Sequence, residues 1–351
     1  TQDPSDRNEI FGGISYYKHD TDNNNLTVDG VKKDLEAAYG GKTNGLANAT
    51  NNHVVINRTN YNVPGTPGKI KKVIGGYTQA PYTVSNDVEA AGVAAGNEAV
   101  VYDGTVSEGL YGGYAKGDKG KARSNKAIVG GGSVATVYGG IATENGGEAT
   151  ENKAEIYGGT VTNVYGGAVD KSDAAATLNT AQVSGGTVTG TIAGASAVYD
   201  TAAGAMHTYS NANLVVLGKD NAARALPMDV ALASIYGTDY RDPSVASPEQ
   251  TFNGGSDQIK GNELNVTTTG VSAKKVRNFD SYIFTIGNNF KNDDTMLTLT
   301  EAGGFGRVSN AASNPAVKVD WTKVKADTSH LSTVRGQGAH GKNTITLTAR
   351  R

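Results

Sequence analysis

Residues 137–167 read VYGGIATENGGEATENKAEIYGGTVTNVYGG, and this stretch decides the fold. It contains Val-Tyr-Gly-Gly twice, so that Tyr138 and Tyr165 stand 27 residues apart. Between the two copies lie short runs rich in Val, Ile and Thr, bounded by Gly-Gly or Asn, which is the pattern of short β-strands. A recurrence at this distance is typical of repeat proteins, whose units stack on one another.

The same aromatic-Gly-Gly element recurs over about residues 10–195. Its last four copies follow at intervals of 27 residues, and the earlier intervals are 28, 35 and 37. Two further elements keep the same spacing, namely Gly-Gly-Ser/Thr-Val and an asparagine before a short apolar run. The copies of the first element are at Phe11, Tyr39, Ile74, Tyr111, Tyr138, Tyr165 and, with a weaker match, Ile192; the second ends at Val134, Val161 and Val188; the asparagines are Asn25, Asn52, Asn125, Asn152 and Asn179.

These repeats predict a β-structure rather than stacked helices. Two glycines inside each unit would cost an α-helix roughly 2 kcal/mol relative to alanine, and the units lack the leucines of a leucine-rich repeat. We therefore predict an all-β fold, an elongated parallel β-helix or β-solenoid with coils of about 27 residues stacked at ~4.8 Å. We expect the glycine pairs to turn corners with φ > 0 and the asparagines to form hydrogen-bonded ladders along the column.

The regularity changes along the chain. We expect residues 1–210 to form the repetitive solenoid, with loop insertions around 57–100. Residues 211–351 are expected to continue it irregularly and to end in a more hydrophobic β cap, with one short helix in 223–237. The strands expected in this second part are NLVVL at 213–217, SYIFTI at 281–286, TMLTLT at 295–300, AVKVDW at 316–321 and NTITLT at 343–348.

The line of tyrosines has two interpretations. Tyr111, Tyr138 and Tyr165 would stack one above another in successive coils. If they point inward, they fill the core, and a stacked aromatic ladder stabilises a solenoid without any ligand. If they point outward, they form a stripe that stacks on sugar rings or on peptide. These three tyrosines are therefore the candidate ligand-binding residues.

Composition narrows the class of protein. Apolar residues make up 37% of the 351 residues, with 47 glycines and 8 prolines, and no Gly-X-Y period of collagen is present. A net charge of −2 gives no electrostatic case for nucleic acid or an anionic membrane. The chain has no cysteine, which excludes disulfides, thiol nucleophiles and cysteine-ligated metals.

No apolar run reaches the ~20 residues of a membrane span, and no signal peptide is visible. We expect a processed or trimmed start and a natural polypeptide that continues beyond Arg351.

Catalytic motifs are missing from the sequence. It contains no Gly-Asp-Ser-Gly, Gly-x-Ser-x-Gly or His-Glu-x-x-His, and the five histidines show no metal-ligand spacing. A lyase or glycosidase stays possible, because its carboxylates can come from different coils. The acidic stretches 19–25 and 292–294 contain oxygen ligands suited to calcium, or else are polar turns. We predict no enzyme activity, no cofactor and no metal.

The VYGG and GGTV units resemble the passenger domains of Gram-negative type V autotransporter adhesins. Residues 276–304, VRNFDSYIFTIGNNFKNDDTMLTLTEAGG, are similar to the stretch that many passengers place shortly before their translocator barrel. The resemblance implies a β-helical passenger that crosses the outer membrane and is displayed at, or released from, the bacterial cell surface. Membrane attachment would come only through a translocator barrel that is not in this chain. The absence of cysteine fits this export route.

The resemblance and the missing catalytic motifs together predict a non-catalytic adhesin. Its expected partners are a host-cell or matrix protein, a glycan, or another copy of itself, and not nucleic acid. Two alternatives stay open. One is a β-helical carbohydrate-active enzyme, a lyase or glycosidase, and the other is a purely structural stalk.

Overall fold

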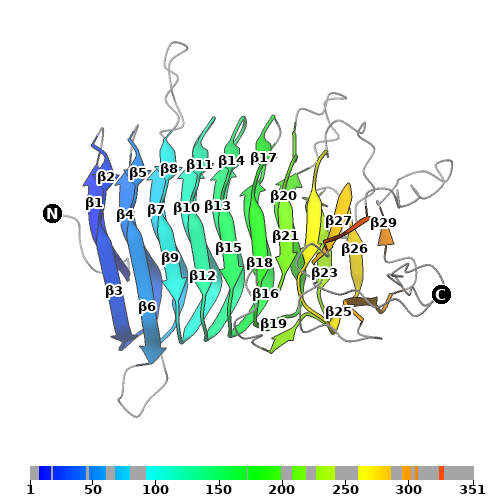
Figure 1. Ribbon diagram of the computed structural model, residues 1–351. Coiled ribbons are helices and arrows are strands. Elements are labelled where there is room, and N and C mark those ends of the chain that lie inside the picture. Colours follow the sequence, from blue (N-terminus) through cyan, green and yellow to red (C-terminus); the bar gives the residue numbers. More distant parts are fainter. Residues whose placement is uncertain are drawn as a thin grey trace, which may run out of the picture.

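The chain folds as a parallel β-solenoid, as the computed structural model shows (Figure 1). The structure describes residues 8–16, 19–44, 47–60, 68–79, 92–171, 173–198, 208–218, 227–241, 260–285, 295–301, 305–306 and 324–327. These residues form strands, turns and bends without any helix, and hence contain no helix long and apolar enough to cross a membrane. The predicted fold class is confirmed.

The coils up to β17 (Ala175–Thr177) pass through three parallel sheets, which we name A, B and C in chain order, and the later coils continue sheets A and C. The long strands of sheet A are β1 (Glu9–Tyr16), β4 (Leu35–Asn44), β7 (Ile70–Gln79), β10 (Thr105–Lys116), β13 (Ser133–Thr143), β16 (Thr160–Val169), β20 (Thr191–Val198), β23 (Ser234–Arg241), β26 (Lys275–Arg277) and β29 (Phe305–Gly306), with β19 (Gly186–Val188) and β22 (Met228–Asp229) beside them. Sheet B holds β2 (Thr21–Asp22), β5 (Ala49–Thr50), β8 (Val93–Ala95), β11 (Lys121–Arg123), β14 (Glu148–Thr150) and β17 (Ala175–Thr177).

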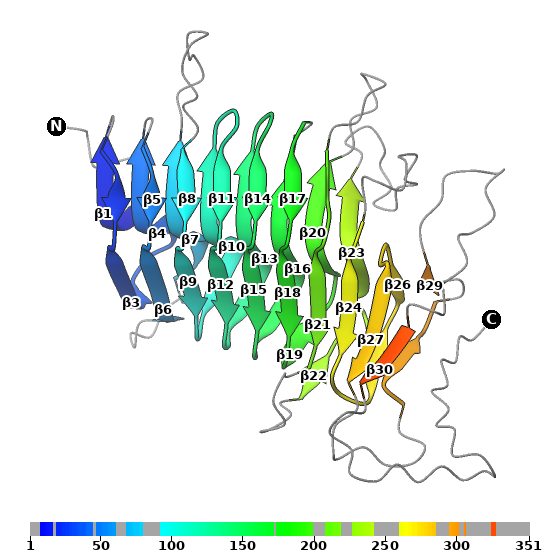
Figure 2. The ribbon, with the colours of Figure 1, turned by 45° about the horizontal axis from the view of Figure 1, so that its top comes forward.

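Sheet C completes the coil before the chain returns to sheet A. It holds β3 (Asn25–Val31), β6 (His53–Asn60), β9 (Glu98–Val101), β12 (Lys126–Val129), β15 (Lys153–Ile156), β18 (Thr180–Val183), β21 (Leu214–Leu217), β24 (Glu263–Val266), β27 (Ser281–Thr285) and β30 (Val324–Asp327). A separate pair joins β25 (Val271–Ala273) to β28 (Leu297–Leu299). Figure 2 shows the strands of successive coils lying side by side along the column.

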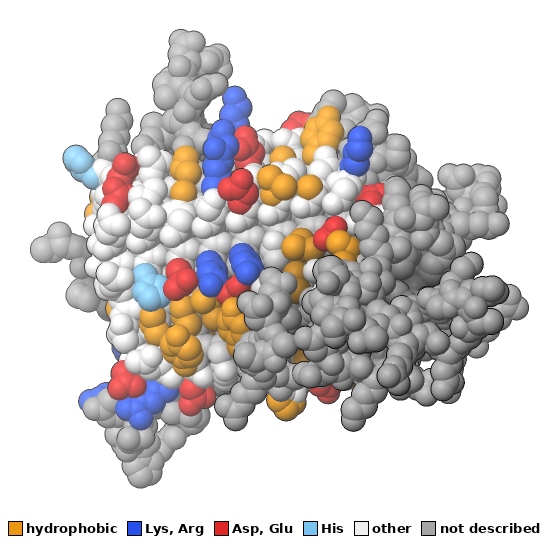
Figure 3. All heavy atoms as spheres, viewed as in Figure 1, with side chains coloured by type: hydrophobic (Ala, Val, Ile, Leu, Met, Phe, Trp, Pro, Cys, Tyr) orange, Lys and Arg blue, Asp and Glu red, His pale blue; other side chains and the backbone are white. Residues whose placement is uncertain are grey.

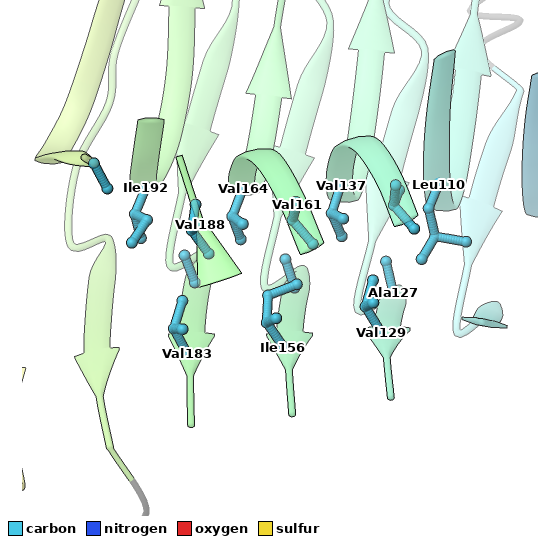
Figure 4. Close-up of a cluster of buried hydrophobic side chains, with 14 of the residues drawn as sticks. Leu110, Ala127, Val129, Val137, Ile156, Val161, Val164, Val183, Val188 and Ile192 are labelled. Atoms are coloured by element: carbon cyan, nitrogen blue, oxygen red, sulfur yellow. The ribbon is translucent and has the colours of Figure 1, made fainter. Parts of the chain in front are cut away.

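The core enclosed by the sheets is thin and consists of two parts, and two smaller buried clusters lie on the tyrosine side of sheet A. Between sheets A and C, aliphatic side chains such as Val137 and Val164 lie opposite Val129 and Ile156, and all four are fully buried (Figure 4). Between sheets A and B the core is mostly alanine, and Ala142 of β13 packs there. Small core residues bring the two walls close together, so each coil contributes few apolar atoms and stability depends on stacking many coils.

The predicted asparagine ladder is confirmed and runs along the turn between sheets B and C. In each step the backbone N–H and the side-chain Nδ2 of one asparagine donate to Oδ1 of the next. For Asn125 and Asn152 these distances are 3.0 and 2.9 Å. The expectation for Asn25 is wrong, because Asn25 lies in register with His53, whereas its neighbour Asn24 donates to Asn52. The full ladder is Asn24, Asn52, Asn97, Asn125, Asn152, Asn179, Asn213 and Asn262.

The two kinds of glycine pair have different roles. In the Gly-Gly-Ser/Thr-Val element, Gly132 and Gly159 turn the corner into sheet A with φ of 75° and 78°, as predicted. The Val-Tyr-Gly-Gly pair does not turn a corner, because Gly139 and Gly140 lie inside β13 and neither has a positive φ. A Cβ on Gly140 would overlap the side-chain amide of Asn152. Both positions require glycine, because the turn between sheets B and C lies so close that there is no room for a side chain.

The later part of the chain keeps the solenoid but with longer intervals. The predicted strands at 213–217, 281–286 and 295–300 correspond to β21, β27 and β28. Those at 316–321 and 343–348 lie outside the described residues, as do the stretches 61–67 and 80–91 of the expected insertions.

Two further expectations are corrected. Described residues 227–241 form β22, a turn and β23, so the expected short helix is absent from them. The repeat alignment also shifts by one residue at β20. Ala193, and not Ile192, pairs with Tyr165, while Ile192 pairs with Val164 in the core.

Candidate functional site: the concave face of sheet A

The tyrosines of the repeat form a stack on the outer face of sheet A. Tyr111, Tyr138 and Tyr165 pair in register, with ring centroids 5.2 Å apart at each step and rings inclined by 5° and 18°. Their preceding residues, such as Val137, enter the core, so alternation along the strand directs the rings outward. The predicted stack is confirmed. Tyr165 is buried in a hydrophobic cluster with Ala193 and Tyr236, and the partly buried Tyr138 packs against this cluster.

This outer face is concave, because the strands of sheet A that carry a glycine pair, β1 to β16, bend at that pair. In a flat strand, residues three apart point to opposite faces. Tyr111 and Tyr114 are three apart on β10, yet their ring centroids lie 5.4 Å from each other. Likewise, Nζ of Lys42 lies 4.5 Å from the ring centroid of Tyr39 on β4. Both side chains of each pair therefore lie on the inside of the bend.

We call this surface the concave face and define it by three positions in each strand, in register from coil to coil. The first comprises Glu9, Ala37, Lys72, Gly109, Thr136, Asn163, Thr191 and Ser234. The second comprises Phe11, Tyr39, Ile74, Tyr111, Tyr138, Tyr165, Ala193 and Tyr236. The third comprises Ile14, Lys42, Tyr77, Tyr114, Ile141, Ala168, Ser196 and Asp239.

Stacking determines which parts of the tyrosines meet solvent. Tyr138 lies between Tyr111 and Tyr165, so both of its ring faces are covered by neighbouring rings. Tyr165 is only 1% exposed, whereas Tyr111 and Tyr138 are partly exposed. Burial, with smaller contributions from Tyr138 and Tyr114, raises the pKa of Tyr111 above its ordinary value. The faces of the stacked rings are therefore not open to a sugar ring.

A buried lysine occupies the N-terminal end of the concave face. Lys42 is 6% exposed, and its Nζ lies 3.2 Å from Oε2 of Glu9. Three rings also surround the ammonium, with centroids at 4.5 Å for Tyr39, 5.3 Å for Phe11 and 5.7 Å for Tyr77. Cation–π contacts and the ion pair together offset the cost of burying this charge.

A buried carboxyl group occupies the other end. The hydroxyl of Tyr165 donates to Oδ2 of Asp239 over 3.1 Å, and Asp239 is 7% exposed. Burial raises the pKa of Asp239 to about 7. Burial and the carboxyl of Asp239 raise the pKa of Tyr236 to about 12, against the opposing charge of Arg277. No sequence motif points to this carboxyl group, because the contact depends on the bend in sheet A.

Several charged side chains of sheet C form ion pairs with one another. A row of charged side chains crosses this side of the column (Figure 3). Within it, Nε2 of His53 lies 3.0 Å from Oε1 of Glu98, and the ammonium groups of Lys126 and Lys153 lie 2.7 and 2.6 Å from the carboxylate of Glu155. Burial raises the pKa of Glu155, but hydrogen bonds from the two lysines hold it below its ordinary value. These ion pairs join side chains of neighbouring strands on the outer surface of sheet C.

The described residues contain no group of three or more His, Cys, Asp or Glu side chains that could hold a metal ion. In the acidic stretch 19–25, Asp20 accepts the N–H of Asn48 over 2.7 Å, and Asp22 accepts a bond from the hydroxyl of Thr50. Both carboxylates thus bridge successive coils. The stretch 292–294 lies outside the described residues.

Comparison of the chain with protein-family models, with curated proteins and with solved structures finds no match. The sequence and the geometry of the concave face are therefore the basis for any functional proposal.

Proposed function

We propose that this chain is a non-catalytic adhesin, the passenger of a type V autotransporter, which attaches a bacterium to host or neighbouring cells from the cell surface. The observation that supports this proposal is the concave face, where Tyr111, Tyr138 and Tyr165 repeat in register at its second position. A long ligand lying along the column meets this position once in each coil. Weak contacts of one kind then add up along one molecule, as in multivalent binding.

The column itself suits this role. In-register strands hold each tyrosine, threonine and asparagine of the concave face at a fixed height, so a ligand meets a preorganised surface. Preorganisation lowers the entropy cost of binding. A stiff column also keeps the binding surface away from the cell that displays it.

Binding of the purified chain to cells tests this proposal. Fluorescently labelled chain is added to epithelial cells, to immobilised matrix proteins and to bacteria that display the chain, and saturation is measured. Analytical ultracentrifugation reports self-association in the same material. Saturable binding to one of these targets, or concentration-dependent self-association, is the expected result. A chain that binds none of them and stays monomeric would favour the structural stalk.

A second candidate function is cleavage of a carbohydrate, and one observation favours it. The charges of Asp239 and Arg277 both act on Tyr236 at one end of the concave face, and burial raises the pKa of Asp239 to about 7. A carboxyl group with such a pKa is suited to proton transfer at neutral pH. Release of reducing ends from polysaccharides by the native chain, abolished in Asp239→Asn, would establish this activity. The same assay without product release would exclude it for the substrates tried.

A further inference from the structure

We propose that the chain forms a two-fold symmetric dimer through the open edge of β1, with the two copies of β1 paired antiparallel. This inference rests on the proposed adhesive function and names the surface that binds another copy of the chain. β1, β2 and β3 are the end strands of the three sheets, and each pairs with one described neighbour only. All three lie at the N-terminal end of the column (Figures 1 and 2). Backbone groups along such an edge are open to a further strand.

The hydrogen bonds of the first coil show which backbone groups of β1 face the open side before the glycine pair. The carbonyl of Asn8 accepts the N–H of Glu36 in the next coil, over 2.8 Å. Backbone groups point alternately to the two sides of a strand. Those of Glu9 and Phe11 therefore point to the open side.

The alternation shifts at the glycine pair. Thr143 of β13 is the register counterpart of Tyr16, and its carbonyl accepts the N–H of Gly117 in the preceding coil. The backbone groups of Tyr16, and by alternation those of Ile14, therefore point toward the preceding side. No described coil precedes β1, so these groups are open as well.

These four residues match themselves under a two-fold axis. Antiparallel pairing centred on the glycine pair places Glu9 opposite Tyr16 of the second copy, and Phe11 opposite Ile14 of the second copy. All four have their backbone groups on the open side, so opposite residues exchange N–H···O bonds. Both strands bend at the same two glycines, so the bends coincide. Such an interface is isologous and closes as a dimer.

The side chains of this edge lack the cover that later coils have. Ile14 and Tyr16 are 39% and 49% exposed, whereas Lys42, in register with Ile14 on the next strand, is 6% exposed. The ring of Phe11 stacks on Tyr39 with centroids 5.2 Å apart, and no described ring stacks on its other face. In the dimer, Phe11 of each copy covers Ile14 of the other, and this removes apolar surface from water.

The asparagine ladder also ends at this edge. Asn24 donates to Asn52, but no described group donates to Oδ1 of Asn24. Asn24 is half-buried, whereas Asn52 is fully buried. A Cβ on Gly13 would overlap the amide of Asn24, so this amide lies beside the glycine pair. The two-fold axis therefore brings the Asn24 amides of the two copies together, and an amide has both a donor and an acceptor for such a pair.

The charges and the bend favour a second copy over an unrelated peptide. β1 contains no lysine or proline, the residues that commonly block edge strands. Its one charged residue, Glu9, is paired with Lys42, and the two copies of Glu9 lie at opposite ends of the paired strands. A straight extended peptide would diverge from β1 at the bend, whereas the second copy bends at the same place.

Analytical ultracentrifugation of the whole chain, from micromolar to millimolar concentration, tests the proposal. The native chain should form a dimer and nothing larger. The edge variant combines Ile14→Lys with Tyr16→Pro, which removes an open N–H without removing a bond to β4. One hydrogen bond is lost at each end of the paired strands, and each contributes about three- to tenfold, so the dissociation constant should rise about tenfold or more.

The matched control is Leu232→Lys, which changes a 57% exposed leucine in the turn before β23. Its dimer should be as tight as that of the native chain, and all variants should melt at the native temperature. A second measurement fixes the register, since the chain has no cysteine. Phe11→Cys and Ile14→Cys, mixed in equal amounts and oxidised with diamide, should form more disulfide-linked dimer than either variant alone.

Three results would overturn the inference: a monomer at every concentration, a dimer equally tight in the edge variant, or equal cross-linking of the mixture and of a single variant. Growth into longer assemblies would replace it with head-to-tail stacking of columns. Cell binding separates these failures from failure of the proposed function. If a monomeric chain binds cells, adhesion stands and the dimer is excluded. If the dimer forms through β1 but the chain binds no cell and aggregates no bacteria, the dimer stands and attachment to cells is excluded.

Discussion

The hydroxyl of Tyr165 on β16 donates a hydrogen bond to Oδ2 of Asp239 on β23, across 3.1 Å and over the intervening strand β20. On β20 the corresponding positions are the small residues Ala193 and Ser196, which leave room for this contact. The bond joins residues 74 apart in the sequence and ties three coils together. It also places an acidic group where water is largely excluded.

The first prediction concerns the pH dependence of stability. The pKa of Asp239 is about 7 in the folded chain, whereas an unfolded aspartate has a pKa of about 3.9. The folded state therefore binds this proton more tightly. The stabilisation is fully present below pH about 4, is lost as the pH rises toward 7, and then stays constant. Asp239→Asn should remove this dependence and stabilise the chain at pH 8 by up to about 4 kcal/mol.

Thermal melting between pH 4.5 and 8 measures the effect. The native chain should lose stability over this range, and Asp239→Asn should lose less. Asp118→Asn, at an exposed position, is the matched control and should behave as the native chain. Parallel melting curves of native chain and Asp239→Asn at every pH would contradict the prediction.

The second prediction concerns the asparagine ladder. Asn152→Ala removes the oxygen that accepts the backbone N–H of Asn125, and also removes the Nδ2 bonds to Asn179 and to the carbonyl of Ala122, 2.8 Å away. Each buried polar group left without a partner costs about 1–3 kcal/mol. We expect a loss of about 2–4 kcal/mol in urea denaturation. Asn145→Ala, at an exposed turn, should cost less than about 0.5 kcal/mol. Equal midpoints for the two variants would show that the ladder contributes little.

The sequence predicted the parts of the fold that depend on local spacing. Asn125, Asn152 and Asn179 recur at constant distance, so their spacing alone indicates the ladder. Asn97 and Asn213 belong to the same ladder but were missed, because loops of different length separate them from their neighbours. A period identifies a coil only where the coil has no insertion.

The sequence does not predict the concave face, and the reason is a different one. The spacing predicted that Tyr138 and Tyr165 stack, but not on which side of the sheet. That side depends on which residue of each Val-Tyr pair enters the core, and here it is the valine, such as Val137. The residue three positions after the aromatic position, such as Asp239 on β23, joins the same face only because the strand bends. Contacts created by a change of strand direction leave no periodic signal.

The third prediction compares a glycine that is required by close packing, Gly140, with one that is required by its backbone conformation, Gly270. A methyl group on Gly140 meets the amide of Asn152 inside the column, where nothing can move aside. Gly140→Ala should therefore destabilise the chain by more than about 2 kcal/mol or prevent folding. Gly270 has a φ of 73°, but no atom lies within 4 Å of the position that a methyl group would take there. Gly270→Ala should therefore cost only the conformational strain of about 1 kcal/mol. The midpoints of urea denaturation compare the stabilities of the two variants. A smaller loss of stability in Gly140→Ala than in Gly270→Ala would refute the packing explanation.

The last prediction concerns an unfavourable residue at a corner. The residue before each of three ladder asparagines has a left-handed backbone, with φ of 53° at Asn51, 58° at Glu151 and 59° at Leu178. Leucine is disfavoured there by about 1–2 kcal/mol, whereas asparagine tolerates it. Leu178 is also 52% exposed, so its side chain gains little from packing. Leu178→Asn should raise the free energy of unfolding by about 0.5–1 kcal/mol, and the reverse change Asn51→Leu should lower it. Urea denaturation measures both changes in the free energy of unfolding. A loss of stability in Leu178→Asn would mean that contacts of the leucine side chain outweigh its backbone strain.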